Sequence, residues 1–120
     1  MSVPLSVNQL ISTKDYKDFV ANGNRIIILT TAWCKTAVMM SIVFERLMPK
    51  YKQYMEFAKI DVDNFPEIIQ HERVGAVPEF LIYKDGKLHC RKHCTHNDSI
   101  EHFIDKFLQT TGAYDVYDDY

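Results

Sequence analysis

Apolar residues in the first part of the chain follow a helical period in some segments and a strand-like pattern in others. Ser12-Thr13-Lys14-Asp15 is a capping sequence, and apolar residues at helical spacing follow it until Asn22-Gly23-Asn24. Residues 25–31 are β-branched and continuously apolar at their centre, which is typical of a strand buried on both faces. Residues 57–62 predict a second buried strand.

A long helix is predicted between these strands, after Trp33-Cys34. Its expected buried face consists of apolar residues at helical spacing: Met39, Met40, Val43, Phe44 and Leu47. Pro49 has no amide proton, so we expect it to bend or end this helix. After the second strand, Asn64 is the expected N-cap of a short helix that has Pro66 in its first turn and runs towards His71.

The last part of the sequence predicts a hairpin and a helix. Residues 80–83 and 87–92 are the expected strands, joined by the turn sequence Lys84-Asp85-Gly86. Asn97 or Asp98 is the expected N-cap of the last helix. The apolar stripe of that helix is Ile100, Phe103, Ile104, Phe107 and Leu108.

The order of these elements predicts an α/β fold. After a weak first strand, parallel strand–helix–strand units precede an antiparallel hairpin, which gives a mixed central sheet of four to five strands with helices on both faces. A chain of 120 residues suits one such domain, which we expect to span residues 1–108. Residues 109–120 form an acidic, tyrosine-containing C-terminal tail, with Gly112 as the expected helix stop.

Composition and charge exclude several classes of protein. A formal net charge of −2 gives no electrostatic reason to expect nucleic acid as a partner, and no apolar run is long enough to cross a membrane. The first ten residues lack the basic and apolar regions of a signal peptide, and three cysteines do not suit a disulfide scaffold. We therefore expect a reducing compartment, the cytoplasm or the nucleus.

Four short motifs occur along the chain in a fixed order. Trp33-Cys34-Lys35-Thr36-Ala37 lies at a strand-to-helix turn, and the others are Lys59-Ile60-Asp61-Val62-Asp63, Gly75-Ala76-Val77-Pro78 and Lys84-Asp85-Gly86-Lys87. With these motifs and their separations, the sequence resembles the thioredoxin family from about residue 5 to residue 108. The resemblance implies a thioredoxin fold and a cis Val77–Pro78 peptide bond that faces the cysteine turn.

The resemblance implies protein thiol–disulfide exchange with Cys34 as the nucleophile. At a helix N-terminus, unpaired backbone N–H groups and the helix macrodipole stabilise a thiolate, and Lys35 adds positive charge beside it. The implied substrate-binding residues are Trp33, Lys35, Val77 and Pro78. Protein or peptide disulfides are the implied substrates, a reductase or a small thiol is the electron donor, and no bound cofactor is expected.

Ala37 occupies the position of the family's second, resolving cysteine. Without a second thiol, Cys34 is expected to stop at a mixed disulfide. Three explanations are open. The chain is a resolving-cysteine mutant of a dithiol enzyme; or it is a natural monothiol form in which Cys94, expected at the substrate groove, resolves the mixed disulfide; or it is a redox-inactive protein-binding module. Cys94 is alternatively a small residue that fills a glycine position of the family.

Other positions near the expected site also depart from the family pattern. Ile28 stands where the family has a buried acid, Thr30 where it has an aromatic residue, and Ile42 where it has a proline. Lys59 is retained, although its usual acidic partner is absent. Several departures together favour natural divergence over a single replacement at Ala37.

Residues 89–96 contain three histidines and two cysteines, which are residue types that bind zinc. Cys90 and Cys94 would share one face of a strand but lie about 13 Å apart, at roughly 3.3 Å per residue. That separation is too large for one tetrahedral ion or for a disulfide between them. We therefore expect no metal site, and instead an edge strand with a positively charged face.

Overall fold

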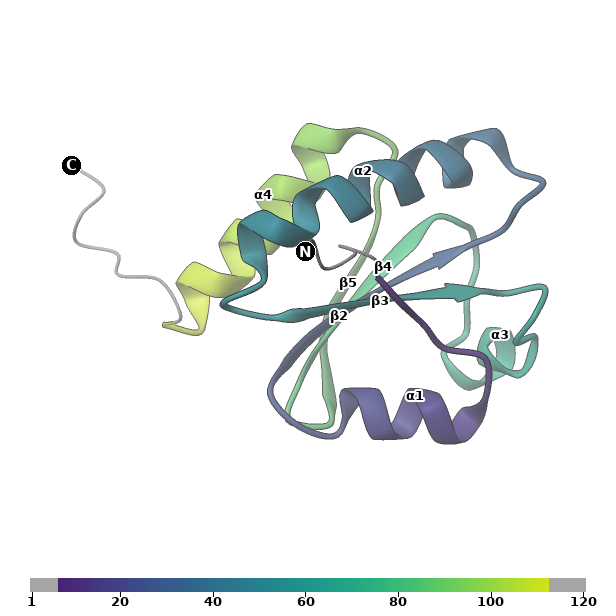
Figure 1. The fold of residues 1–120 in the computed structure, drawn as a ribbon, viewed down its shortest axis with the longest axis horizontal. Coiled ribbons are helices and arrows are strands. Elements are labelled where there is room, and N and C mark those ends of the chain that lie inside the picture. Colours follow the sequence, from purple (N-terminus) through teal and green to yellow (C-terminus); the bar gives the residue numbers. More distant parts are fainter. Residues whose placement is uncertain (1–6, 113–120) are drawn as a thin grey trace, which may run out of the picture.

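The structure is a computed structural model, which describes residues 7–112 and contains a mixed five-stranded sheet. The strands are β1 (Asn8–Gln9), β2 (Asn24–Thr30), β3 (Glu56–Asp61), β4 (Glu79–Lys84) and β5 (Lys87–His93). They lie in the order β1-β3-β2-β4-β5 (Figure 1). β1, β3 and β2 run parallel, whereas β4 is antiparallel to β2 and β5 is antiparallel to β4. The predicted mixed sheet is confirmed, including its weak first strand.

Helices cover both faces of this sheet, as the sequence predicts (Figure 1). On one face lie α2 (Lys35–Tyr51) and α4 (Asn97–Thr110). On the other face lie α1 (Thr13–Val20) and α3 (Glu67–His71). Each pair of helices encloses its own hydrophobic core against the sheet.

The central strand β2 supplies side chains to both cores. Ile26 and Ile28 belong to the core beneath α2 and α4. Ile27 and Leu29 belong to the core beneath α1 and α3. Successive side chains of a strand point to opposite faces, so a strand covered on both faces must be apolar at every position. This explains the continuous apolar run that predicts the strand.

The buried face of α2 differs from the predicted one. It consists of residues at helical spacing, namely Ala37, Met40, Ser41, Phe44, Met48 and Tyr51. Met39 lies outside this row and is 61% exposed, so its prediction as a core residue is wrong. Adjacent apolar residues fit two neighbouring rows of a helix equally well. The packing of the Phe44 ring against Phe57 and Phe80, at centroid distances of 4.7 and 5.8 Å, selects the row.

α2 also continues past Pro49 and ends at Tyr51. A proline in the last turn removes only one intrahelical hydrogen bond, so the helix is not ended there. The chain then leaves the helix through a turn in which the N–H groups of Tyr54 and Met55 donate to the Tyr51 carbonyl, at 2.8 and 3.0 Å. The two extra residues place the Tyr51 side chain in the core.

The start of α1 agrees with the sequence, and the start of α3 does not. The Ser12 hydroxyl accepts a hydrogen bond from the N–H of Asp15 at 3.1 Å, so the predicted cap is confirmed. The N-cap of α3 is Pro66 instead of Asn64. Asn64 belongs to the preceding turn, where its N–H donates to the Asp61 carbonyl at 2.9 Å.

The two ends of α4 also refine the predicted boundaries. Its N-cap is His96, whose side chain makes no capping hydrogen bond, so neither Asn97 nor Asp98 is the cap. The helix ends at Thr110, two residues after the expected end of the domain. Gly112 follows with a φ of +79°, in the left-handed region that glycine enters without steric cost. Residues 113–120 of the predicted tail lie outside the described residues.

None of the helices within residues 7–112 has both the length and the apolar character that a membrane crossing requires.

Candidate active site

Cys34 begins α2 at the turn that follows β2. Its backbone is extended (φ −102°, ψ 114°), and its carbonyl accepts a hydrogen bond from the N–H of Val38 at 3.0 Å. The side chain is half-buried, no side chain caps the helix here, and the first turn contains no acidic residue. Cys34 therefore lies at a helix N-terminus whose backbone N–H groups have no side-chain cap.

The sheet brings the Cys34 turn and the loop before β4 close together, at one end of the neighbouring strands β2 and β4. Leu29 of β2 pairs with Glu79 of β4 in antiparallel register, so the end of β2 lies beside the start of β4. The chain passes from the end of β2 to Cys34, and Pro78 directly precedes β4. Pro78 is buried, Val77 is half-buried, and the peptide bond between them is cis. The predicted nucleophile and two predicted binding residues thus flank neighbouring strand ends.

Side chains of β5 hold the loop before β4 in place. Nδ1 of His93 lies 2.7 Å from the carbonyl oxygen of Pro78. Arg91 donates two hydrogen bonds to the Glu79 carboxylate, at 2.7 and 2.9 Å, and these bonds raise the pKa of Arg91. None of these contacts was predicted from the sequence. The register of the predicted hairpin could have indicated them, because it pairs Glu79 with His93 and sets the end of β5 beside Pro78.

Ala37 lies one helical turn after Cys34 and is completely buried. Its carbonyl oxygen accepts a hydrogen bond from the buried Thr30 hydroxyl at 3.2 Å. Ile28 is completely buried in the core beneath α2, where the resemblance implies an acid. Position 37 is therefore a buried alanine whose carbonyl has a hydrogen-bond partner, and position 28 offers no carboxylate to accept a proton.

Lys59 has an ion-pair partner that was not predicted from the sequence. Its ammonium lies 3.2 Å from the carboxylate of Glu45, which belongs to α2. The Lys59 side chain is 25% exposed and the Glu45 side chain is 42% exposed, so the pair lies near the surface. Glu45 therefore neutralises the retained lysine in the absence of an acid at position 28.

Exposed apolar side chains lie along the sequence around Cys34. Trp33 is 75% exposed, and Val38, Met39 and Ile42 on α2 are 40%, 61% and 48% exposed. Lys35 is also exposed, at the first position of α2. Met39, which the sequence predicts to be a core residue, is one of these exposed side chains.

The other two cysteines occupy different environments from Cys34. Cys94 is 2% exposed and is part of the core beneath α2 and α4. Burial raises the pKa of the Cys94 thiol, and the nearby Lys92 partly offsets this effect. Cys90 is half-buried, and burial raises its pKa as well. Cys94 is therefore a core residue in this conformation.

The three cysteines within residues 7–112 are free thiols. Across the same residues, His, Cys, Asp and Glu side chains form no group of three or more that could hold a metal ion.

Comparison with known proteins identifies the family to which this chain is similar. The family model described as Thioredoxin matches residues 7–106. The chain belongs to the thioredoxin family. It is 35% identical to a thioredoxin of Coprinus comatus over 82 residues, which cover 66% of this chain and 77% of the relative. It is 34% identical to the thioredoxin-like protein CXXS1 of Arabidopsis thaliana over 82 residues, which cover 68% of this chain and 69% of the relative.

Solved structures agree with the family assignment and show the thioredoxin fold. The oxidised form of mitochondrial thioredoxin 3 from Saccharomyces cerevisiae superposes with a TM-score of 0.77 at 26% identity, over 83% of this chain and 94% of that one. Plasmodium falciparum thioredoxin superposes with a TM-score of 0.80 at 22% identity, over 84% of this chain and 99% of that one. The predicted fold class is therefore confirmed.

Proposed function

We propose that this thioredoxin-family protein carries out protein thiol–disulfide exchange with Cys34 as its single nucleophile. The observation that carries the proposal is the position of the Cys34 sulfur, half-buried at an uncapped helix N-terminus whose first turn has no acidic residue. Membership of the family supports thiol–disulfide chemistry in general. The burial of Cys94 and the raised pKa values of Cys90 and Cys94 support Cys34 as the reactive thiol among the three.

The first step forms a mixed disulfide. The Cys34 thiolate attacks one sulfur of a substrate disulfide, the Cys34–substrate S–S bond forms, and the second substrate sulfur leaves as a thiolate. The substrate disulfide is thereby half reduced, and Cys34 is oxidised to the mixed disulfide. We propose that Trp33, Lys35, Val77 and Pro78 contact the substrate, because they lie on the turn and the loop at neighbouring strand ends.

The second step takes its thiol from outside the chain. A thiolate of a small thiol or of a reductase attacks the Cys34 sulfur, and the substrate leaves as a thiolate that takes up a proton. The donor then forms a mixed disulfide with Cys34, which a second donor thiol reduces to regenerate the free cysteine. Resolution by Cys94 is the competing route, and it requires a core side chain with a raised pKa to reach Cys34.

We propose that Ala37 is the natural residue of a monothiol form. Three features support this proposal: Ile28 is an apolar core residue, the Thr30 hydroxyl donates to the Ala37 carbonyl, and Lys59 pairs with Glu45. A resolving cysteine needs a proton acceptor, and the buried Ile28 cannot serve as one. The reducing compartment that such free thiols require is the cytoplasm or the nucleus.

An insulin-reduction assay with glutathione as the donor tests the proposal on this chain, Cys34→Ser, Cys94→Ala and Ala37→Cys. We expect this chain and Cys94→Ala to be equally active and Cys34→Ser to be inactive. We expect Ala37→Cys to gain little, because position 28 offers no carboxylate. Loss of activity in Cys94→Ala with a native melting temperature would establish the internal route.

The alternative function is a redox-inactive module that binds proteins. The exposed apolar side chains Trp33, Val38, Met39 and Ile42 favour it, since such a surface can bind a partner without covalent chemistry. Activity that is absent from both this chain and Ala37→Cys, while both melt cooperatively, would favour the binding module over thiol–disulfide exchange.

A further inference from the structure

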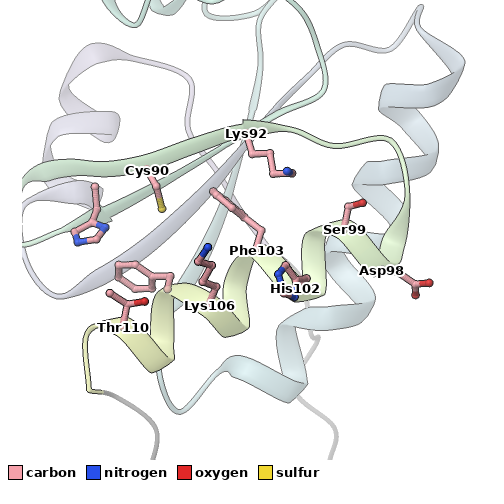
Figure 2. A pocket seen from close by; sticks show the side chains of 10 residues that line it. Cys90, Lys92, Asp98, Ser99, His102, Phe103, Lys106 and Thr110 are labelled. Carbon is pink, nitrogen blue, oxygen red and sulfur yellow. The ribbon is translucent and has the colours of Figure 1, made fainter. Parts of the chain in front are cut away.

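A groove of about 650 Å³ lies between β5 and α4, formed by side chains that the exchange reaction does not use (Figure 2). Its apolar lining includes the half-buried Cys90 and Phe103 and the buried Phe107. Figure 2 shows Cys90 projecting from β5 towards α4, with Phe103 and Lys106 projecting from α4 towards β5. Phe103 and Phe107 belong to the predicted apolar stripe of α4, so one edge of that stripe reaches the surface.

The groove carries positive charge on both of its sides. Lys92 comes from β5 and Lys106 from α4, and both are exposed. Neither lysine forms an ion pair with another residue in the described part of the chain, and Asp98 is the acidic lining residue at the start of α4. His102 adds a side chain that gains positive charge when it is protonated. An acidic segment with aromatic side chains would complement this combination of charge and apolar surface.

Such a segment follows the groove in the sequence. Residues 113–120 read Ala-Tyr-Asp-Val-Tyr-Asp-Asp-Tyr, with three aspartates and three tyrosines. Tyrosine presents an apolar ring and a polar hydroxyl, which suits a shallow groove that has a charged rim. The segment contains no lysine or arginine, so it has no positively charged side chain that would repel Lys92 or Lys106.

The chain is also long enough to reach the groove. Thr110, at the end of α4, is itself a lining residue. From Thr110 back to Asp98, twelve residues of α4 span about 18 Å at 1.5 Å per residue. Eight extended residues reach about 26–29 Å, so residues 113–120 are long enough to run back along the whole groove.

We propose that residues 113–120 bind in the groove between β5 and α4 of the same molecule. The aspartates pair with Lys92 and Lys106, and tyrosine rings cover Cys90 and Phe103. Exposed ion pairs are individually weak, but a short connection raises the local concentration of the segment to about the millimolar range. The proposal is independent of the exchange reaction, since it uses neither Cys34 nor the loop before β4.

Amide chemical shifts of the full chain and of a chain that ends at Gly112 test this proposal. Truncation changes the amide shifts close to Gly112 whether or not the segment binds. The diagnostic amides are therefore those of Lys92 and His102, at the other end of the groove. We expect these amides to differ between the two chains at low salt. The differences should shrink as salt is added, and the Cys90 thiol should alkylate several-fold more slowly in the full chain.

Two charge variants of the full chain complete the test. Lys92→Glu with Lys106→Glu, or Asp115→Asn with Asp118→Asn and Asp119→Asn, should remove the differences. The matched control Lys17→Glu reverses an exposed charge on α1, on the opposite face of the sheet, and should preserve them. Unchanged Lys92 and His102 shifts on truncation would overturn the proposal. So would differences that grow with protein concentration, because they would indicate the segment of a second molecule.

Discussion

The imidazole of His93 and the carbonyl of Pro78 lie 2.7 Å apart, which links the end of β5 to the loop beside the proposed nucleophile. A carbonyl oxygen can only accept, so Nδ1 of His93 is the donor in this contact. The hydrogen bond anchors the residue that directly precedes β4. His93 is thus a positioning residue for the proposed substrate loop.

Replacing His93 tests this positioning role. We expect His93→Ala to lower the free energy of unfolding by about 0.5–1.5 kcal/mol, the usual net value of one intramolecular hydrogen bond. It should also raise KM for a disulfide substrate more than it lowers kcat, because the loop and not the sulfur is disturbed. His93→Asn, which retains a donor of similar reach, should restore part of both. Equal stability and kinetics in all three proteins would show that the contact positions nothing.

The orientation of α2 is tested by a pair of substitutions. Phe44 is completely buried and Met39 is 61% exposed, although both belong to the stripe that the sequence predicts. We expect Phe44→Ala to lower the free energy of unfolding by about 3–5 kcal/mol, the usual cost of removing a buried aromatic ring. Met39→Ala, an exposed substitution, should change it by about 0.5 kcal/mol or less. Urea unfolding monitored by circular dichroism measures both, and similar costs would contradict the assigned helix face.

This pair also illustrates how far the sequence predicts the fold. The centre of β2, residues 26–29, is continuously apolar because helices cover both faces of this strand, so its pattern identifies the strand. The buried face of α2 is less determined, since Met39 beside Met40 and Val43 beside Phe44 fit two adjacent rows. Only the contacts of Phe44 with rings on neighbouring strands decide between these rows.

The N-caps of helices and the partners of site residues are a second feature that the sequence does not predict reliably. Asn64 is a good capping residue in any sequence, but here its N–H is used in the turn after β3, and the helix starts after Pro66. The motifs locate Cys34 at the start of α2 and Pro78 directly before β4, because these motifs are local in sequence. His93 and Glu45 act through contacts across strands or between a helix and a strand, and a single sequence does not encode which residues meet there.

A tyrosine pair predicts how stability depends on pH. The hydroxyls of Tyr16 and Tyr83 are hydrogen-bonded to each other, and Tyr16 also donates to Glu72 at 2.7 Å. Burial raises the pKa of both phenols, and their mutual hydrogen bond and Glu72 raise that of Tyr16 further. The folded pKa values lie above the unfolded value of about 10, so the unfolded state ionises first as pH rises.

The stability that these neutral phenols provide is therefore fully present below about pH 10 and is lost as pH rises beyond it. We expect the free energy of unfolding to fall above that pH, as measured by urea titrations between neutral pH and pH 11. In Tyr16→Phe with Tyr83→Phe the decline should be markedly smaller, although the double variant starts from a lower stability. A decline of the same slope in both proteins would contradict the assigned role of the pair.

Cysteine reactivity provides a direct test of the environments of the three thiols. With a limiting amount of iodoacetamide at neutral pH, we expect Cys34 to be modified first. Cys90 and Cys94 should follow at least several-fold more slowly, because burial raises the pKa of both thiols and Cys94 is 2% exposed. Peptide mass spectrometry measures the order. Modification of Cys94 at the rate of Cys34 would show that the core around Cys94 opens readily.

The most direct measurement is the intact mass of the reduced chain after it reacts with a peptide disulfide in the absence of any other thiol. The account predicts one peptide added per chain, located on Cys34, that persists until a small thiol is supplied and is absent from Cys34→Ser. No adduct, or an adduct on Cys90 or Cys94 while Cys34 stays free, would contradict it.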